Sequence, residues 1–556
     1  MKNYDPITLG ILWDRLISIA NEIVLTLVRT SFSTIVRESY DLACVLFDAK
    51  GRALAQGTYG MPTFSGTAPQ TMRYMLEKYP PESLKPGDVV ITNDTWMGAG
   101  HLWDVNIMRP AFRNGKLVGF AFSITHLPDI GGRGYSAING NIYEEGLQIP
   151  VMKLFREGEI NEDLMGILRQ NVRVSEMVIG DLMANVTATE VGCRKLVEFM
   201  DEYGIDDLQP LSDKIIGQSE AAMRHEISQI PDGVYTNELK LEGLEDEPIS
   251  IACAITIKGD RFSVDFTGTG PTVEASMNVP LCYTRAMACY SAKCLLLPRM
   301  PNNEGSVTPI EVSAPKGCVL NAQPPAATGA RHLVGHNVMP LMFGALANAL
   351  PERVQAEPAF TNIMNFYGTK RDGSQFSTLY FSAGGLGALS GMDGNSTTPS
   401  PSNMRGIPTE VWETATNIWI EKRSLRPDSG GAGECRGGLG QITVLRNETG
   451  HPLTLLGVGR RDQFPARGLQ GGSDGATRAF FINGQKVNPR RRYVLKPGDT
   501  LELHDAGGGG YGDPSKRAHA LIQKDIDAGL LTAEGARAGY GIKVDDKGRI
   551  VTSRPG

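Results

Sequence analysis

Long apolar runs are missing from this chain of 556 residues, although 41% of its residues are hydrophobic. A membrane-spanning helix needs roughly 20 consecutive apolar residues, and no stretch of the sequence reaches that length. The N-terminal segment MKNYDPITLGIL also lacks a basic region followed by an uninterrupted apolar core, which a secretion signal would need. We therefore expect a protein without membrane segments, located in the cytoplasm.

The chain also lacks a strong excess of either charge. Its 55 basic and 61 acidic residues give a formal net charge of −6, and the two signs are interspersed. Nucleic-acid binders carry a basic patch or stripe, so this class is excluded.

Neither paired cysteines nor a phosphate-binding loop is present. The eight cysteines are scattered without a CxxC pair, which indicates reduced, buried thiols. The only Gly-Lys pair, Gly115-Lys116, is followed by Leu117, so the chain has no Walker A loop. This excludes a phosphate-loop nucleotide site, whereas an actin-like nucleotide site would not need such a loop.

A long helix is expected at the N-terminus. Asp5 can cap it, and Pro6 fits the first helical position because its missing N–H costs nothing there. Apolar residues then recur at steps of three and four, which is typical of a helix that packs along one face. They are Leu9, Trp13, Leu16, Ala20, Ile23 and Leu27.

Strand patterns dominate from residue 41 to about 149. The segment DLACVLFDAKGRALAQG predicts a hairpin that turns at residues 48–51. The segment KLVGFAFSITH alternates, so that one face carries every second residue. That face holds Val118, Phe120, Phe122, Ile124 and His126.

The order of the elements favours an α+β fold over alternating βα units. We expect a large, mixed, multi-region fold with an N-terminal metal-bearing β region, central helices and a Gly-rich β region toward the C-terminus. Helical patterns cover 161–204 and 212–228, strands resume near 248, and the tail after 513 is helical. The expected domains are 1–230 with the metal site, a central α/β region over 231–430, the Gly-rich β region over 431–513, and the tail over 514–556.

Histidine and aspartate concentrate in two turns of the N-terminal region. His101 and Asp104 lie three residues apart in the stretch TNDTWMGAGHLWDVNIM. His126, in the segment ITHLPD, is the last residue of an expected strand. Imidazole and carboxylate together suit Zn²⁺, Mn²⁺ or Fe²⁺. Residues three apart cannot share one face of a strand, so we expect Gly98 and Gly100 to let an exposed turn bring the pair together.

His126 and Asp41 each need a partner if their side chains are buried. His126 shares its face with apolar residues, and Asp41 begins a strand with Ala43 and Val45 on its core side. A buried imidazole or carboxylate is costly unless it is paired. A metal would satisfy both residues, and ordinary turn residues with a hydrogen-bonded core histidine are the alternative.

Three other matches to known catalytic motifs are disfavoured. Residues 471–475 match GxSxG without the preceding apolar strand that a nucleophile elbow needs. Residues 507–512 match GxGxxG with too little chain after them for a βαβ unit. The facial triad of an iron oxygenase is disfavoured by the additional aspartate.

The chain resembles the B subunit of the hydantoinase/oxoprolinase family. The resemblance rests on RESYDLACVLFDAKGRALAQG, GDVVITNDTWMGAGHLWDVNIMRPAF, ITHLPDIGG, EEGLQIPVMKL, DFTGTGP, MNVPLCYT, LRPDSGGAGECRGGLG and GGGGYGDP, and it extends to about residue 513. It implies a divalent metal. For a donor set of two imidazoles and two carboxylates, zinc is slightly favoured over manganese or iron. Gly100 and Trp103 replace the usual Thr and Pro of the family's turn, while both metal-binding positions are kept. The implied ligands are Asp41, His101, Asp104 and His126.

The resemblance also implies the chemistry and a partner. The family attacks a cyclic amide or imide carbonyl with the help of ATP, and a separate ATPase-like A subunit supplies the nucleotide site. This chain would carry the metal, whose bound water has a pKa of roughly 7, and ATP would enter only through the partner. Asp129 would act as general base or orient a ligand, or else serve its turn. Arg133 would hold a substrate carboxylate or phosphate, or else lie on the surface.

Two alternatives remain open at this point. The same site would serve an ATP-dependent ketone carboxylase subunit. A non-catalytic partner whose metal only stabilises the fold would instead need a closed four-ligand shell.

Overall fold

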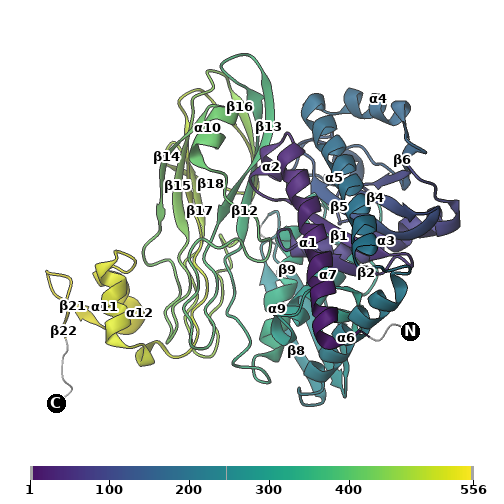
Figure 1. Cartoon of the computed structure of the whole chain (residues 1–556). Coiled ribbons are helices and arrows are strands. Elements are labelled where there is room, and N and C mark those ends of the chain that lie inside the picture. Colours follow the sequence, from purple (N-terminus) through teal and green to yellow (C-terminus); the bar gives the residue numbers. More distant parts are fainter. Residues whose placement is uncertain (1–3, 246, 552–556) are drawn as a thin grey trace. The chain divides into compact units, whose positions relative to one another are not determined.

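The computed structural model describes residues 4–245 and 247–551, which form an α+β fold (Figure 1). The chain divides into two compact units. The first contains Met1–Tyr235, Cys253–Met339 and Ser377–Leu379, and the second contains Thr236–Ala252, Pro340–Phe376 and Tyr380–Gly556.

A seven-stranded sheet with the order β2-β1-β5-β4-β3-β6-β7 forms the centre of the first unit. The expected hairpin at residues 48–51 is confirmed, since it joins antiparallel β1 and β2. β5 lies between β1 and β4 and is antiparallel to both. The strands are β1 (Leu42–Asp48), β2 (Ala53–Gln56), β3 (Val89–Thr92), β4 (Asp104–Arg113), β5 (Lys116–His126), β6 (Met152–Arg156) and β7 (Glu159–Ile160).

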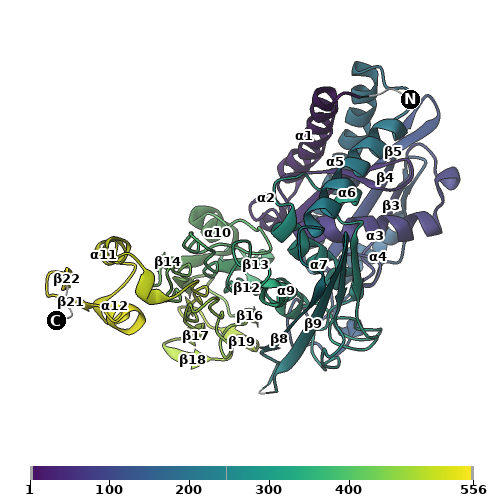
Figure 2. The same cartoon turned by 90° about the horizontal axis from the view of Figure 1, so that it is seen from below.

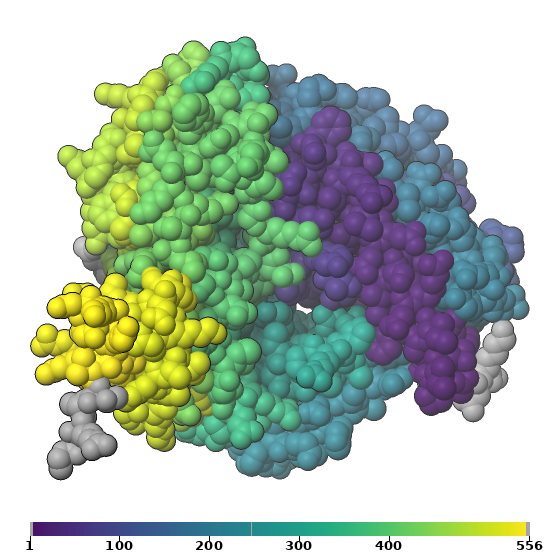
Figure 3. Space-filling view, turned by 60° about the vertical axis from the view of Figure 1, so that its left-hand side comes forward, coloured from purple at the N-terminus to yellow at the C-terminus, as the bar shows by residue number. Residues whose placement is uncertain are grey.

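The N-terminal helix α1 (Pro6–Thr30) begins where the sequence predicts it. The side chain of Asp5 caps it by accepting hydrogen bonds from the backbone N–H groups of Ile7 and Thr8. All six residues of the expected apolar stripe are buried. α1 lies beside α5 (Ser175–Glu202), and α5 in turn packs on β4 and β5. One side of α1 remains at the surface (Figure 3).

The helical stretch expected over 161–204 is two helices, α4 (Glu162–Asn171) and α5. The break occurs at Arg173, whose backbone N–H donates to the carboxylate of Asp129 rather than to a helix carbonyl. The remaining helices of the first unit include α2 (Thr34–Arg37), α3 (Pro62–Lys78), α6 (Gln209–Ile227), α7 (Leu281–Leu296) and α8 (His332–Gly335).

A second sheet has the order β11-β10-β9-β8, and its long β8 and β9 are visible in Figure 2. The strands expected after residue 248 are confirmed as the antiparallel pair β9 and β10. The division between the two units runs through β8 and β9. The bounds are β8 (Gly233–Leu241), β9 (Ile249–Lys258), β10 (Arg261–Asp265) and β11 (Ile310–Ser313).

The second unit contains two sheets with a shared apolar core. Trp412 is buried in this core, with its ring edge-on to Phe366 and Tyr380. The sheets have the orders β13-β12-β16-β19 and β14-β15-β20-β17-β18. The elements are α9 (Val338–Leu346), β12 (Thr361–Thr369), β13 (Gln375–Ala383), α10 (Thr409–Thr416), β14 (Ile418–Leu425), β15 (Gln441–Asn447), β16 (Leu453–Val458), β17 (Ala479–Ile482), β18 (Gln485–Val487), β19 (Arg492–Leu495) and β20 (Thr500–His504).

Glycine-rich segments of the second unit pack backbone against backbone. A side chain at Gly385 would collide with the carbonyl of Gly438, and one at Gly507 would collide with the carbonyl of Ser429. Gly508 donates its N–H to Gly438 at 2.9 Å and accepts from Gly431 at 2.9 Å. These glycines therefore permit close backbone approach in segments that belong to neither a helix nor a strand.

The C-terminal segment contains α11 (His519–Asp527) and α12 (Ala533–Tyr540), as expected. It also contains the short antiparallel pair β21 (Lys543–Val544) and β22 (Ile550–Val551), which the sequence patterns did not predict. Within the described ranges, no helix combines the length and the apolar character needed to cross a bilayer.

Candidate metal centre

Three side chains meet at one end of the seven-stranded sheet. Asp104 is the first residue of β4 and lies opposite His126, the last residue of β5. His101 follows Gly100, whose φ of +91° is a conformation that glycine adopts without strain. The antiparallel register and this turn bring residues from two strand ends together.

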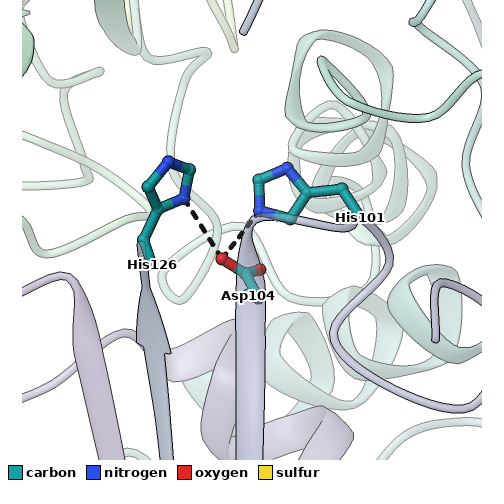
Figure 4. A group of neighbouring side chains, drawn as sticks. All are labelled: His101, Asp104 and His126. Atoms are coloured by element: carbon teal, nitrogen blue, oxygen red, sulfur yellow. Dashed lines mark hydrogen bonds and ion pairs between the residues drawn. The ribbon is translucent and has the colours of Figure 1, made fainter. Parts of the chain in front are cut away.

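The carboxylate of Asp104 lies between the two imidazoles (Figure 4). Its Oδ1 is 2.7 Å from Nε2 of His101 and 3.2 Å from Nδ1 of His126. The three side chains each offer a ligand atom, and these atoms lie within 4.8 Å of one another. Asp104 is fully buried, and His101 and His126 are 2% and 3% exposed. The expectation of an exposed turn at Asp104 is therefore wrong, because β4 places this residue inside the sheet.

The tautomer of His101 follows from the hydrogen bond of its Nδ1 atom. Nδ1 lies 2.9 Å from the carbonyl oxygen of Gly329, which only accepts, so Nδ1 carries the proton. The lone pair of Nε2 then faces the cluster, where this atom makes no hydrogen bond. Burial, together with the charge of Arg331, lowers the pKa of His101 to about 4. A neutral imidazole with a lone pair directed at the cluster is the form that binds a metal.

Arg331 occupies the other oxygen of Asp104. Its guanidinium donates to Oδ2 at 2.6 Å and to the carbonyl of Ala99 at 2.8 Å, and it lies 4.5 Å from the ring centre of Tyr283. Burial alone would raise the pKa of the Asp104 carboxyl, but the opposing charge of Arg331 helps to hold it below its usual range. Asp104 is thus ionised, with one oxygen directed at the two histidines.

Asp41 lies beside this cluster, just before β1. Its Oδ2 is 3.9 Å from Nδ1 of His126, and its buried Oδ1 has no hydrogen-bond partner among the described residues. Burial raises the pKa of Asp41 to about 7; the charge of His126 opposes this shift and that of Asp104 adds to it. Asp41 is outside the tight group of three, so its role as a fourth ligand stays a prediction.

The donor set fits a divalent metal. Two imidazoles and one or two carboxylates suit zinc, manganese or iron. The unbonded Nε2 of His101 and Oδ1 of Asp41 are buried polar atoms, which cost free energy unless something binds them. His101, Asp104 and His126 would hold the ion, with Asp41 next to them.

Aromatic rings cover the cluster. The ring of Tyr135 is edge-on to His101, Trp103 and His126, with centre distances of 5.8, 5.3 and 5.4 Å. Its hydroxyl lies 3.1 Å from Nδ1 of His332. All of these side chains are buried, so the cluster is shielded from bulk water on this side.

Glu145 supports the loop that orients His101. One of its carboxylate oxygens accepts from the N–H groups of Thr328 and Gly329, at 3.0 and 2.7 Å. Burial raises the pKa of Glu145 to about 7. The carboxyl group therefore anchors the segment whose Gly329 carbonyl bonds to His101.

Asp129 and Arg133 make contacts outside the cluster. Asp129 accepts from the backbone and guanidinium of Arg173 and from the N–H of Gly131 at 3.3 Å. Arg133 is exposed and pairs with Glu144 at 2.9 Å. These contacts fit the structural alternatives stated for both residues, and their functional roles stay predictions.

Sequence reasoning missed Arg331, Tyr135, His332 and Glu145. The run ARHLVGHN holds an arginine and two of the eight histidines, which was a usable signal for the first and third. Glu145 lies in EEGLQIPVMKL, one of the stretches that carry the family resemblance, but its spacing to other residues gave no sign of a role at the site, and the same holds for Tyr135.

Known proteins resemble this chain along almost its whole length. The family described as hydantoinase B/oxoprolinase matches residues 5–514. The B subunit of a putative D-/L-hydantoinase from Pseudomonas sp. (strain NS671) is 30% identical, over 99% of this chain and 97% of the relative. The crystal structure of the ATP-dependent caprolactamase from Pseudomonas jessenii has a TM-score of 0.91 and 28% identity, with 99% and 98% covered. A nucleotide-free acetone carboxylase structure, at 20% identity, shares the fold with a TM-score of 0.91 over 99% of this chain and 81% of that one.

Proposed function

Because the chain belongs to the hydantoinase B/oxoprolinase family, we propose that it is the metal-bearing B subunit of an ATP-dependent cyclic-amide hydrolase. Its substrate would be a hydantoin, 5-oxoproline or a related lactam. The observation that carries the proposal is the buried cluster of His101, Asp104 and His126, with the charge of Asp104 matched by Arg331. The names of two relatives, the B subunit of a hydantoinase and an ATP-dependent caprolactamase, support the reaction class.

The chain's own residues have distinct tasks in this proposal. His101, Asp104, His126 and Asp41 hold the ion, for which zinc is slightly preferred over manganese or iron. When bound, a divalent ion supplies Lewis acidity and lowers the pKa of water at neutral pH. Arg331 keeps Asp104 ionised and directs only one of its oxygens to the metal.

Positioning and exclusion of water complete the site. The Gly329 carbonyl keeps the proton of His101 on Nδ1, and the Tyr135 ring limits access of bulk water to the imidazoles. Asp129 is assigned to the turn over 129–133, because its oxygens are bonded to Arg173 and Gly131. Arg133 is assigned to the surface.

An amide is a poor electrophile because resonance stabilises its carbonyl. We assign activation of the carbonyl to an ATPase-like A subunit that uses ATP, and this chain then receives the activated ring. The absence of a Walker A loop agrees with this division, and one relative is itself named as one subunit of a hydantoinase. The chain alone is expected to show no ATP hydrolysis.

The test is reconstitution of this chain with its A subunit. We expect hydantoin or lactam hydrolysis that requires ATP, both subunits and a divalent metal, and that falls by orders of magnitude with His126→Ala. Robust ATP turnover by the isolated chain, or full ring opening by the His126→Ala complex, would contradict the proposal.

A ketone carboxylase subunit is the second candidate, supported by the shared fold of acetone carboxylase. The same reconstituted complex decides between the two. Bicarbonate-dependent consumption of a ketone, with no ring opening of any lactam, would favour carboxylation.

A further inference from the structure

A cavity lies between α3 and α7 of the first unit, away from the metal cluster. Its volume is ≈ 80 Å³, and none of the four predicted metal ligands lines it. A water molecule needs roughly 10–15 Å³ of such space, so the cavity has room for a ligand of about five to eight heavy atoms. The two helices are in close contact beside it, since a Cβ at Gly66 would lie 2.9 Å from the Cβ of Ala286.

Basic side chains outnumber acidic ones in the cavity wall. The lining contains one carboxylate, that of Glu304, and three basic side chains, those of Arg73, Arg285 and Lys293. Glu304 is already paired with the guanidinium of Arg73. Two positive charges are therefore left without a counter-charge from the wall.

Lys293 is the more buried of these two cations, with 7% of its surface exposed. Its Nζ donates to the carbonyls of Leu297 and Met300, both at 2.5 Å, and these oxygens carry no full charge. No carboxylate of the described residues comes within 4.0 Å of it. Burial lowers the pKa of Lys293 to about 8, as expected for an ammonium group without an anion.

Arg285 is half-buried on the same helix. Its side chain bonds to the thiol of Cys289, and it makes no ion pair with any carboxylate in the described part of the chain. A guanidinium has five N–H donors in a planar fork that matches a carboxylate, and one thiol leaves most of them available to a ligand.

The lining also contains apolar side chains, which are those of Val45, Ala53, Pro69 and Val307. A ligand that matches both kinds of lining side chain has an anionic end and a short hydrocarbon end. We propose that this cavity binds a small organic carboxylate, with its carboxylate at Arg285 and its apolar end against the apolar part of the lining. This proposal does not depend on the proposed reaction, because the site contains no residue of the metal cluster.

The test is a titration of the full-length chain at constant ionic strength with propionate, with inorganic phosphate, and with chloride as the reference. Calorimetry and thermal denaturation are read in parallel. We expect saturable propionate binding with a dissociation constant on the order of 1 mM, and no saturable binding of phosphate or chloride.

Arg285→Gln keeps hydrogen-bonding capacity and removes the charge, and it breaks no ion pair, so this variant is expected to fold. Propionate should bind it at least about tenfold more weakly, the change produced by a loss of 1.4 kcal/mol. Arg194→Gln, at an exposed position on α5, is the matched control and should bind as the unmodified chain does. Lack of saturable propionate binding, equal affinity in Arg285→Gln, or preference for phosphate would each overturn the proposal.

Discussion

Arg331 and Asp104 are 227 positions apart in the sequence and form a fully buried ion pair at 2.6 Å. The guanidinium bonds to Oδ2, while Oδ1 faces His101 and His126. This single contact decides which oxygen of Asp104 is available to a metal. It also links the start of β4 to the segment that precedes α8.

Arg331→Gln should weaken metal binding without removing a ligand. Loss of a hydrogen bond to a metal ligand typically lowers metal affinity 10–100-fold. The metal affinity of Arg331→Lys should lie between those of the parent chain and Arg331→Gln, because lysine keeps the charge but not the planar array of N–H donors. Competition with a chelator of known affinity measures the metal affinity of both variants. Arg113→Gln, which breaks a surface pair with Asp201, should bind metal normally; unchanged affinity in Arg331→Gln would remove Arg331 from this role.

Asp104→Asn should lose both metal and stability. The change leaves the guanidinium of Arg331 buried without a counter-charge, and breaking a buried pair costs about 3–5 kcal/mol. Urea denaturation measures the free energy of unfolding. The control is Asp201→Asn at an exposed pair, where about 1 kcal/mol or less is expected. A metal-binding, fully stable Asp104→Asn protein would show that this aspartate is neither ligand nor counter-charge.

Asp41→Asn tests the fourth ligand. If Asp41 binds the ion, its replacement should lower metal affinity by at least about tenfold, while the tight group of three still binds. Equilibrium dialysis of the variant against zinc and manganese gives the result. Equal affinity in the variant and the parent chain would leave Asp41 as a neighbour of His126 only.

Removal of the metal should destabilise the chain. A ligand present at 100 times its dissociation constant adds about 2.7 kcal/mol to the stability of the folded state. Thermal denaturation before and after chelation, and after the addition of one equivalent of Zn²⁺ or Mn²⁺, follows the effect. His126→Gln should show no response to metal, and an identical response in this variant would place the ion elsewhere.

Glu145→Gln should alter how stability depends on pH. The pKa of Glu145 is about 7 in the folded chain, against a usual value of 4.5, so the folded state holds its proton more tightly. The contribution of this group to stability is complete below pH ~4.5 and is lost as the pH rises through ~7. Gln retains one acceptor for the N–H groups of Thr328 and Gly329.

The variant should therefore lose less stability than the parent chain between pH 5 and 8, by on the order of 1 kcal/mol. Denaturation midpoints across this pH range provide the measurement, on metal-free protein so that metal binding does not contribute. Parallel curves for the two proteins would show that Glu145 does not titrate in this interval.

Local patterns predicted local structure well. The capped α1, the hairpin of β1 and β2, and the strand β5 were expected because each depends on residues a few positions apart. The alternation along β5 does not separate a buried face from an exposed one, because every residue from Gly119 to His126 is buried. The order of the seven strands was not predicted, since it depends on pairings over long separations, such as β1 with β5. The break before α5 was also missed, because its cause is a contact of Arg173 with the distant Asp129.

In the candidate site, too, features set by nearby residues were predicted and those set by distant contacts were not. The spacing of His101 and Asp104, together with the family resemblance, identified the residues of the cluster. The burial of Asp104 was predicted wrongly, since aspartate is common in turns and here it begins a central strand. Arg331 could not be placed from sequence, because nothing near it indicates a partner in β4.

The glycine-rich backbone packing of the second unit has a consequence for hydrogen–deuterium exchange. The amides of Gly431, Gly438 and Gly508 donate to backbone carbonyls, and side chains are excluded between the paired segments. Exchange requires that such bonds open and meet solvent. These amides should thus exchange as slowly as those of the central strands, although the segments would count as loops by secondary structure. A tag or insertion placed there would unfold the unit, whereas the turn at Gly484 has open space around it.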